Sequence, residues 1–371
     1  MIYHLLDEPF SAETGLGVAT VVANIMRFDA SSVVVCPQGD DSRGIPTDRI
    51  MVIPGLKMLA RRLGWHYLPP SLRRTIIVRT FEPMTSRLRR GDIVWCHNWP
   101  YVAWALEPTI HAKEAKLVYH LHNSIAHFVK RPVFRSFTPD GMIFNSEAMR
   151  QEALALFPHL KNTYTVHNGA DEALFYPRPA GTEVSPSVPV VLYVGRLVHQ
   201  KGVHVLIEAM RILQERKVGA ICRVVGSSHA GGDKGKATPY VDSLHSSSPP
   251  SVQFEGFRSG TGIAEEYRSA DILCCPSIWQ EPFGNVNIEA MACGIPVVAS
   301  RVGGIPEIAS DGGILLVEPD SAVELADALQ RLILDKDLRA RIGAEGLASF
   351  QRRFTWSAIA RQHHEIAESR I

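Results

Sequence analysis

Two glutamates, Glu281 and Glu289, stand on either side of a predicted helix start in the segment WQEPFGNVNIEAMACG. Gly284 indicates a turn, and a helix can run from Asn285 to a favourable end at Gly294. The free backbone N–H groups and the positive dipole of such a helix start bind anions such as a diphosphate. The two carboxylates can therefore accept hydrogen bonds from hydroxyls on different parts of one ligand. The alternative for an isolated pair is two solvated surface acids.

A second segment, YVGRLVHQKGVHVLIEA, places two cations at a strand end. The predicted strand ends at Gly195, and the following helix opens after Gly202. Arg196 and Lys201 occupy the loop between them. Two cations there can neutralise a diphosphate leaving group without a divalent metal, because they stabilise the charge that develops as a C–O bond breaks. Alternatively, they solvate the entrance to the helix.

Glycines and histidines in the first half of the chain are further candidates. Gly15 and Gly17 follow the first predicted strand in ETGLGVATVVANIM, where the lack of a side chain lets the backbone approach a phosphate or a sugar. The spacing G-L-G differs from G-x-G-x-x-G, which argues against a dinucleotide site.

His120 and His122 end the strand candidate KLVYHLH, and alternation along a strand points both side chains to the same face. A structural role for a strand histidine is the alternative.

The elements that position these residues alternate between short apolar runs and longer amphipathic segments. This pattern predicts an α/β protein whose parallel sheets carry helices on both faces. The strand candidates are 31–37, 92–97, 116–122, 141–146, 188–195, 222–226, 251–257, 271–277, 295–300 and 313–319. A proline-rich stretch at 178–189 predicts Rossmann-like domains at 1–177 and 178–355, with a helix at 356–371 as a candidate to cross back to the first domain. Ligands of such sheets bind beyond the carboxyl ends of the strands, so we expect the site in a cleft between the two predicted domains.

Length and composition set limits on function. A chain of 371 residues exceeds what one core usually serves, so two domains are expected. The net charge of +1, from 39 Lys and Arg against 38 Asp and Glu, argues against a nucleic-acid partner. Six cysteines lack C-x-x-C spacing and several lie in apolar runs, so we expect core thiols and a reducing, cytoplasmic location. Neither a signal peptide nor a transmembrane helix is expected.

The two charged segments, together with HNGADEALFYP and GGIPEI, closely resemble the retaining glycosyltransferase family 4. The resemblance is strong over about residues 140–320 and loose elsewhere. It implies the GT-B fold, in which two Rossmann-like domains face each other across a cleft. It also implies that Glu281 contacts the hydroxyls of the donor sugar and that Glu289 contacts the ribose. Arg196 and Lys201 match the pair that binds the diphosphate.

The same resemblance implies further roles in the donor site. Gly17 would belong to the glycine loop near the donor phosphates. His122 resembles the catalytic histidine that approaches the transferred sugar, with His120 as the competing choice, and Asn123 stands where an aspartate is more common. Asn285 stands where the family varies. The backbone that would meet the sugar and the phosphates is that of Phe283, Gly284, Asn285 and Val286.

These features predict retaining transfer of a hexose-type sugar from a nucleoside-diphosphate sugar, with a UDP-sugar as the leading donor, to a hydroxyl of a glycan, lipid-linked or small-molecule acceptor. Phe257 and Arg258 are expected to meet the base. Since no nucleophile is evident, the resemblance implies a front-face mechanism in which the departing phosphate helps to deprotonate the acceptor and Glu281 serves orientation.

No cofactor and no metal are expected. The D-x-D sequence through which other glycosyltransferases hold a cation occurs as Asp335-Lys336-Asp337, which we interpret as solvated charge. The alternatives to a transferase are a phosphorylase or a nucleotide-sugar epimerase on the same fold, and a non-catalytic nucleotide-sugar sensor.

The acceptor side is expected in the N-terminal half. From Gly55 to Arg90, nine cations and one acid are interleaved with apolar and aromatic residues. The segment 55–90 can lie on an anionic lipid surface at the inner face of a membrane, each cation contributing roughly 1 kcal/mol. A solvated basic face or a funnel for an acidic substrate is the alternative. An aromatic group can stack on an acceptor ring or pack in the core, and its members are His97, Asn98, Trp99, Tyr101 and Trp104.

Overall fold

The computed structural model describes residues 1–11, 17–53, 68–125, 137–179, 188–228, 238–369 and 371. These residues form two compact units, and each is described by itself. Unit 1 comprises Met1–His167 together with Trp356–Ile371, and unit 2 comprises Asn168–Thr355. The chain leaves unit 1 before the predicted boundary after residue 177, and residues 180–187 of the predicted linker lie outside the described part.

Unit 1 contains a seven-stranded sheet in the order β3-β2-β1-β4-β5-β6-β7, and every neighbouring pair is parallel. The strands are β1 (Ile2–Leu5), β2 (Ser32–Cys36), β3 (Ile50–Val52), β4 (Ile93–His97), β5 (Lys116–Leu121), β6 (Gly141–Phe144) and β7 (Thr163–Thr165). All five residues of the central strand β4 are buried. A strand covered on both faces is mostly apolar, which explains the run IVWC that precedes His97.

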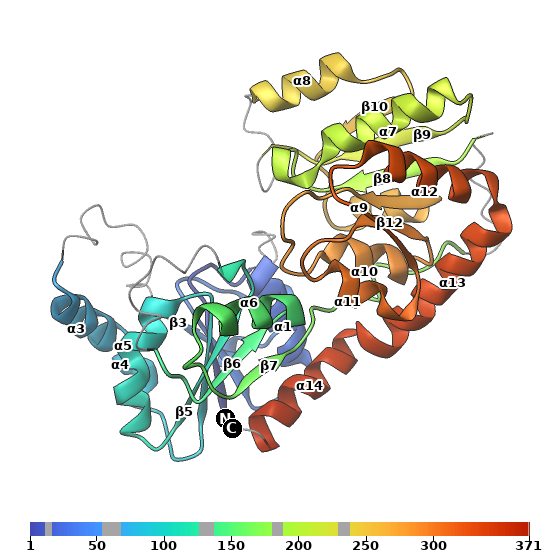
Figure 1. Cartoon of the computed structure of the whole chain (residues 1–371). Helices are drawn as coiled ribbons and strands as arrows, with labels where there is room; N and C mark the ends of the chain where they lie inside the picture. The colour runs from blue at the N-terminus through green and yellow to red at the C-terminus, as the bar shows by residue number, and fades with distance from the viewer. Residues whose placement is uncertain (12–16, 54–67, 126–136, 180–187, 229–237, 370) are drawn as a thin grey trace. The chain divides into compact units, whose positions relative to one another are not determined.

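Helices pack on both faces of this sheet (Figure 1). One face carries α1 (Gly17–Arg27) and α14 (Trp356–Ser369). The other carries α3 (Pro70–Thr80), α4 (Glu82–Thr85), α5 (Pro100–His111) and α6 (Glu147–Leu156). Successive residues of β4 enter the two cores in turn: Val94 packs with the α5 side, and Trp95 packs with α1 and α14. The C-terminal helix is thus part of unit 1.

Unit 2 contains a six-stranded parallel sheet in the order β10-β9-β8-β11-β12-β13. Its strands are β8 (Val190–Val194), β9 (Ile221–Val225), β10 (Val252–Gly256), β11 (Ile272–Cys275), β12 (Val297–Ser300) and β13 (Ile314–Val317). One face packs on α7 (Val203–Glu215), α8 (Pro239–Ser247) and α12 (Ala322–Leu334). The other packs on α9 (Thr261–Arg268), α10 (Asn285–Ala292), α11 (Ile305–Ile308) and α13 (Lys336–Arg353).

The two parallel sheets confirm the predicted α/β fold with two Rossmann-like domains. Each predicted strand is present, and the structure adds β1, β3 and β7 to the numbered candidates. Each of the six cysteines is buried and free.

Candidate active site

The carboxyl ends of β8, β9 and β10 meet at one edge of the unit 2 sheet. The Gly195 N–H donates to the Val225 carbonyl (3.1 Å), and the Gly226 N–H donates to the Gly256 carbonyl (2.9 Å). Arg196 lies two residues after the end of β8, and Phe257 directly follows β10. The order of the parallel strands therefore gathers these loops, as expected for a ligand site in this class of sheet.

The loop after β8 also contacts the loop after β11. The Ile278 N–H donates to the Gln200 carbonyl at 2.9 Å. Gly202 has φ +69°, and a Cβ atom at this position would lie 1.9 Å from the Pro276 carbonyl oxygen. Glycine is required here because any side chain would separate the two loops.

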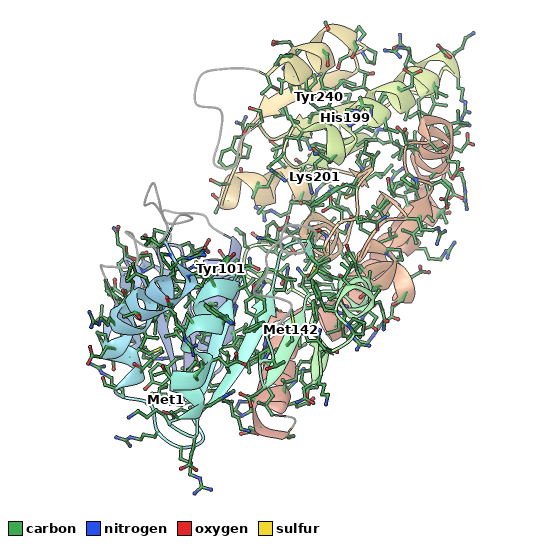
Figure 2. All side chains as sticks on the ribbon, turned by 60° about the vertical axis from the view of Figure 1, so that its left-hand side comes forward. Met1, Tyr101, Met142, His199, Lys201 and Tyr240 are labelled. Carbon is green, nitrogen blue, oxygen red and sulfur yellow. The ribbon has the colours of Figure 1, made fainter. Side chains whose placement is uncertain are left out.

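This contact brings Lys201 and Glu281 together. The Lys201 Nζ lies 2.6 Å from the Glu281 Oε1, and the Ser277 hydroxyl donates to the same oxygen at 2.5 Å. Glu281 is 4% exposed, so its charge is held by two donors away from bulk water. Lys201, labelled in Figure 2, also lies over the Trp279 ring, 5.5 Å from its centroid. The motifs predicted separate roles for these two charges, whereas in the structure they form one ion pair.

The start of α10 follows directly after this pair. Gly284 has φ +100°, and no side chain in the described part of the chain caps the helix. Asn285 is exposed, and its Oδ1 accepts a hydrogen bond from the Asn168 Nδ2 at 3.0 Å. The Phe283 ring is buried against Phe354, so this residue offers a ligand its backbone alone. The helix start keeps its N–H groups available for an anion.

Glu289 lies further along α10 and is half-buried. The Tyr267 hydroxyl donates to its Oε2 at 2.7 Å. Desolvation raises the pKa of Glu289, although the hydrogen bond from Tyr267 opposes this shift. The carboxylate is thus fixed in direction and poorly solvated, which suits it to accept hydroxyl hydrogen bonds from a ligand.

The other residues that were predicted for the donor site have fewer described contacts. Arg196 is exposed, and no ion pair is found for it among the described residues. Phe257 is 43% exposed, and Arg258 lies 3.8 Å from Glu255. Gly15 lies outside the described residues, whereas Gly17 is the first residue of α1.

The start of α1 is already occupied by an acid. The Ala19 N–H donates to the Glu8 Oε1 at 2.6 Å. Desolvation raises the pKa of Glu8. A phosphate that approached Gly17 would therefore meet a carboxylate at the same helix end, a feature that the sequence did not reveal.

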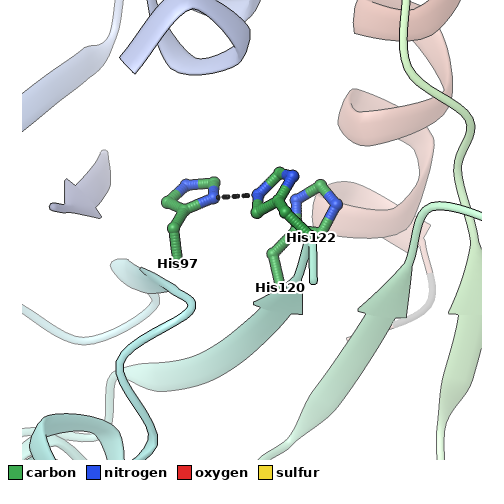
Figure 3. A group of neighbouring side chains, drawn as sticks. All are labelled: His97, His120 and His122. Carbon is green, nitrogen blue, oxygen red and sulfur yellow. Dashed lines mark hydrogen bonds between the residues drawn. The ribbon is translucent and has the colours of Figure 1, made fainter. Parts of the chain in front are cut away.

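In unit 1, His122 belongs to a row of histidines that starts on β1. The His122 Nε2 lies 2.9 Å from the His97 Nδ1, and the His97 Nε2 lies 3.0 Å from the His4 Nδ1. His120 and His122 point to the same side, as predicted, with ring centroids 3.8 Å apart (Figure 3). His120 is 1% exposed, whereas His122 is half-buried and can reach a ligand.

Burial keeps these rings neutral. It lowers the pKa of His122 to about 3 and that of His4 to about 4, and it lowers the pKa values of His97 and His120 well below the ordinary value. The Asn98 Oδ1 fixes the end of β5 by accepting from the His122 N–H at 2.8 Å. His122 can therefore present an uncharged nitrogen at the carboxyl end of its strand.

The aromatic group near β4 packs in the core of unit 1. Trp99, Tyr101 and Trp104 lie against its main apolar cluster. The Arg73 guanidinium lies over the Tyr101 ring (5.7 Å) and the Arg74 guanidinium lies over the Trp104 ring (5.6 Å). The structure thus supports core packing rather than stacking on an acceptor.

Of the basic segment 55–90, residues 55–67 lie outside the described part. No described helix is long and apolar enough to cross a membrane.

Two family models match this chain, one in each half of the sequence. The family model described as "Glycosyltransferase Family 4" matches residues 17–174, and that described as "Glycosyl transferases group 1" matches residues 181–348. A D-inositol 3-phosphate glycosyltransferase from Corynebacterium jeikeium is 41% identical over 402 aligned positions, covering 98% of this chain and 94% of that protein. The chain belongs to glycosyltransferase family 4.

Other relatives of this family 4 glycosyltransferase differ in extent. An alpha-maltose-1-phosphate synthase from Mycolicibacterium smegmatis is 32% identical over 61% of this chain and 62% of that protein. The crystal structure of Anabaena Alr3699/HepE in complex with UDP and glucose covers 99% of both chains with a TM-score of 0.72 and 22% identity. Such structural likeness supports the GT-B fold predicted from the sequence.

Several residues that build the candidate site were not singled out from the sequence. Ser277 and Trp279 hold the ion pair, Tyr267 orients Glu289, and Asn168 contacts the start of α10. Asn168 belongs to the motif HNGADEALFYP and Trp279 to the segment WQEPFGNVNIEAMACG, and these two motifs were the available signals. In the D-x-D sequence, Asp335 caps α13 by accepting from the Leu338 N–H at 2.8 Å, so at least one of its acids has a structural task.

Proposed function

We propose that this glycosyltransferase moves a hexosyl group from a UDP-sugar to a hydroxyl acceptor with retention of configuration and without a metal ion. The observation that carries the proposal is the ion pair of Lys201 and Glu281 at the uncapped start of α10. It combines a cation, a fixed carboxylate and free backbone N–H groups, which are the three partners that a diphosphate-sugar requires.

In this proposal the diphosphate lies at the start of α10 and near Arg196. Lysine carries three N–H donors, so Lys201 can keep Glu281 and still donate to a phosphate oxygen. Both donors to Glu281 use its Oε1, which leaves Oε2 for a hydroxyl of the sugar. The fixed positive groups stabilise the negative charge that grows on the leaving phosphate.

The configuration at the sugar carbon is retained when the phosphate leaves from the same face on which the acceptor attacks. Glu281 is already neutralised by Lys201 and hydrogen-bonded by Ser277, which makes it a weak nucleophile. The leaving phosphate therefore takes the proton of the acceptor hydroxyl as the new bond forms on the same face. Trapping of a covalent glycosyl adduct with a slow substrate, followed by mass spectrometry, would contradict this mechanism.

The choice of UDP draws support from the solved complex of Anabaena Alr3699/HepE with UDP and glucose. A thermal-shift screen against UDP-, GDP- and ADP-sugars tests it, because a ligand that binds only the folded state raises the melting temperature. We expect a rise of several degrees with a UDP-sugar at saturation and a smaller one with the others.

Product analysis tests the reaction class. D-inositol 3-phosphate is the first acceptor to assay, because it is named in the relative that spans nearly the whole chain. Reactions with donor alone, donor plus phosphate and donor plus acceptor separate transfer from epimerisation and phosphorolysis. A glycoside formed with acceptor and absent with donor alone is expected.

We predict that the affinity for the donor falls on acidification because of Glu289. Its pKa is raised above 4.5 by desolvation, so it becomes protonated at a higher pH than an ordinary glutamate does. The charged form, which accepts two ribose hydroxyls, is lost as the pH falls through this raised pKa. The KM for the donor should therefore rise on the acid side in the wild type and stay flatter in Glu289→Gln. Parallel profiles would contradict the assignment.

A further inference from the structure

Three histidine side chains converge at the carboxyl ends of β4 and β5. His97 comes from β4, and His120 and His122 come from the end of β5 (Figure 3). One ring nitrogen from each lies within 4.8 Å of the others. Two nitrogen ligands on a tetrahedral ion at about 2.0–2.1 Å lie roughly 3.3 Å apart, so modest ring rotations bring all three to one centre.

The ring of His120 has unmet bonding capacity. It is 1% exposed, and both its nitrogens are buried without a hydrogen-bond partner among the described residues. An unpaired buried polar group destabilises the folded state. A bound ion would give one of these nitrogens a partner. Neither His97 nor His122 supplies one.

The hydrogen bonds around His97 are compatible with a bound ion. If the His97 Nε2 carries the proton, it donates to the His4 Nδ1 at 3.0 Å, and the lone pair of the His97 Nδ1 is free. The His122 Nε2, 2.9 Å from that Nδ1, can turn its own lone pair to the same point. His4 then fixes the tautomer of a metal ligand, as outer partners of metal-binding histidines commonly do.

We propose that His97, His120 and His122 form a binding site for a borderline divalent transition ion such as Zn²⁺. Three neutral imidazoles with no carboxylate favour Zn²⁺, Co²⁺ or Ni²⁺ over Mg²⁺ and Ca²⁺, which prefer oxygen. Three protein ligands leave a fourth position for water.

A bound ion occupies the Nε2 lone pair of His122. By the family resemblance His122 approaches the transferred sugar in the proposed function, so the ion and the sugar compete for this residue. This consequence rests on the proposed function, whereas the binding of the ion does not. The site therefore acts as an inhibitory switch that responds to free zinc.

The test uses the full chain without a polyhistidine tag, dialysed against EDTA and then against metal-free buffer. Titration with Co²⁺ should give the visible absorption of a tetrahedral site, and equilibrium dialysis with Zn²⁺ should give one ion per chain. His120→Phe keeps a ring but removes the nitrogens, and we expect it to weaken binding at least tenfold. His97→Phe should do the same.

His364→Asn is the matched control, because His364 is an exposed histidine on α14 outside the cluster. It should bind the ion as the wild type does. Circular dichroism melts check that each variant folds. Failure of the wild type to bind one ion per chain overturns the proposal, as does equal binding by a folded His120→Phe.

Activity assays separate this proposal from the proposed function. Zn²⁺ should inhibit sugar transfer by the wild type, competitively with the donor, and EDTA should restore it. If EDTA abolishes transfer, the metal-free reaction is wrong. If the wild type binds one ion and transfers no sugar to any acceptor, the proposed function fails while the metal site stands.

Discussion

Replacing Lys201 by alanine should lower kcat/KM for the donor roughly 100- to 1,000-fold, the usual effect of losing one fixed group that stabilises the transition state. It should also destabilise unit 2. Glu281 is 4% exposed and, among the described residues, would keep only Ser277 as a partner for its charge. Leaving a buried charge unpaired costs about 3 kcal/mol, which corresponds to a melting temperature about 6–12 °C lower.

Two further variants separate the effects of Lys201 on binding and on folding. Lys201→Met combined with Glu281→Gln removes both charges, so the melting temperature should recover most of the loss while the activity stays low. Arg211→Ala breaks an exposed pair with Glu208 on α7 and should cost less than about 1 kcal/mol. If Lys201→Ala melts and reacts like the wild type, the ion pair has neither role.

Replacing His122 by alanine should lower kcat roughly 100-fold while the KM for the donor changes only a few-fold. His122 is half-buried at the end of β5 and neutral, because burial lowers its pKa to about 3. In the proposed function the diphosphate supplies most of the contacts of the donor, so removing a group that acts on the sugar should affect the transition state more than the bound donor.

Steady-state kinetics at saturating acceptor, together with thermal melts, measure this difference. His97→Phe breaks the 2.9 Å contact that orients His122 and should lower kcat by a smaller factor. His364→Asn removes a histidine outside the row and should leave both constants unchanged. A large rise in KM with an unchanged kcat for His122→Ala would contradict this prediction. It would show that His122 stabilises the bound donor and the transition state equally.

The sheet strands were predictable because most of them are continuous apolar runs buried on both faces. β4 and β11 are examples, since every residue of each is buried. β3 and β7 were missed for the opposite reason. Each has three residues, lies at an edge of the sheet and is not buried at any of its positions. The run IMV of β3 is too short to stand out as a strand, and TYT of β7 is not a run of apolar residues.

The contacts inside the candidate site were harder to predict. Lys201 and Glu281 were each selected from local motifs, but their pairing depends on β8 and β11 being neighbours, which local spacing does not encode. The row from His4 through His97 to His122 likewise joins β1, β4 and β5, which are neighbours in the sheet although β2 and β3 separate β1 from β4 in the sequence. Sequence patterns identified the chemical groups, and sheet topology determined which of them meet.

The chain enters unit 2 at Asn168 and leaves it at Thr355, so unit 2 is an insertion within unit 1. The two ends of the insertion are joined, because the Ala170 N–H donates to the Phe354 carbonyl at 3.0 Å. Until unit 2 folds, docking α14 on unit 1 must close a very long loop at an entropic cost. Once those ends are held together, most of that cost is gone. We therefore expect unit 2 to fold first and unit 1 to be completed last, when α14 docks.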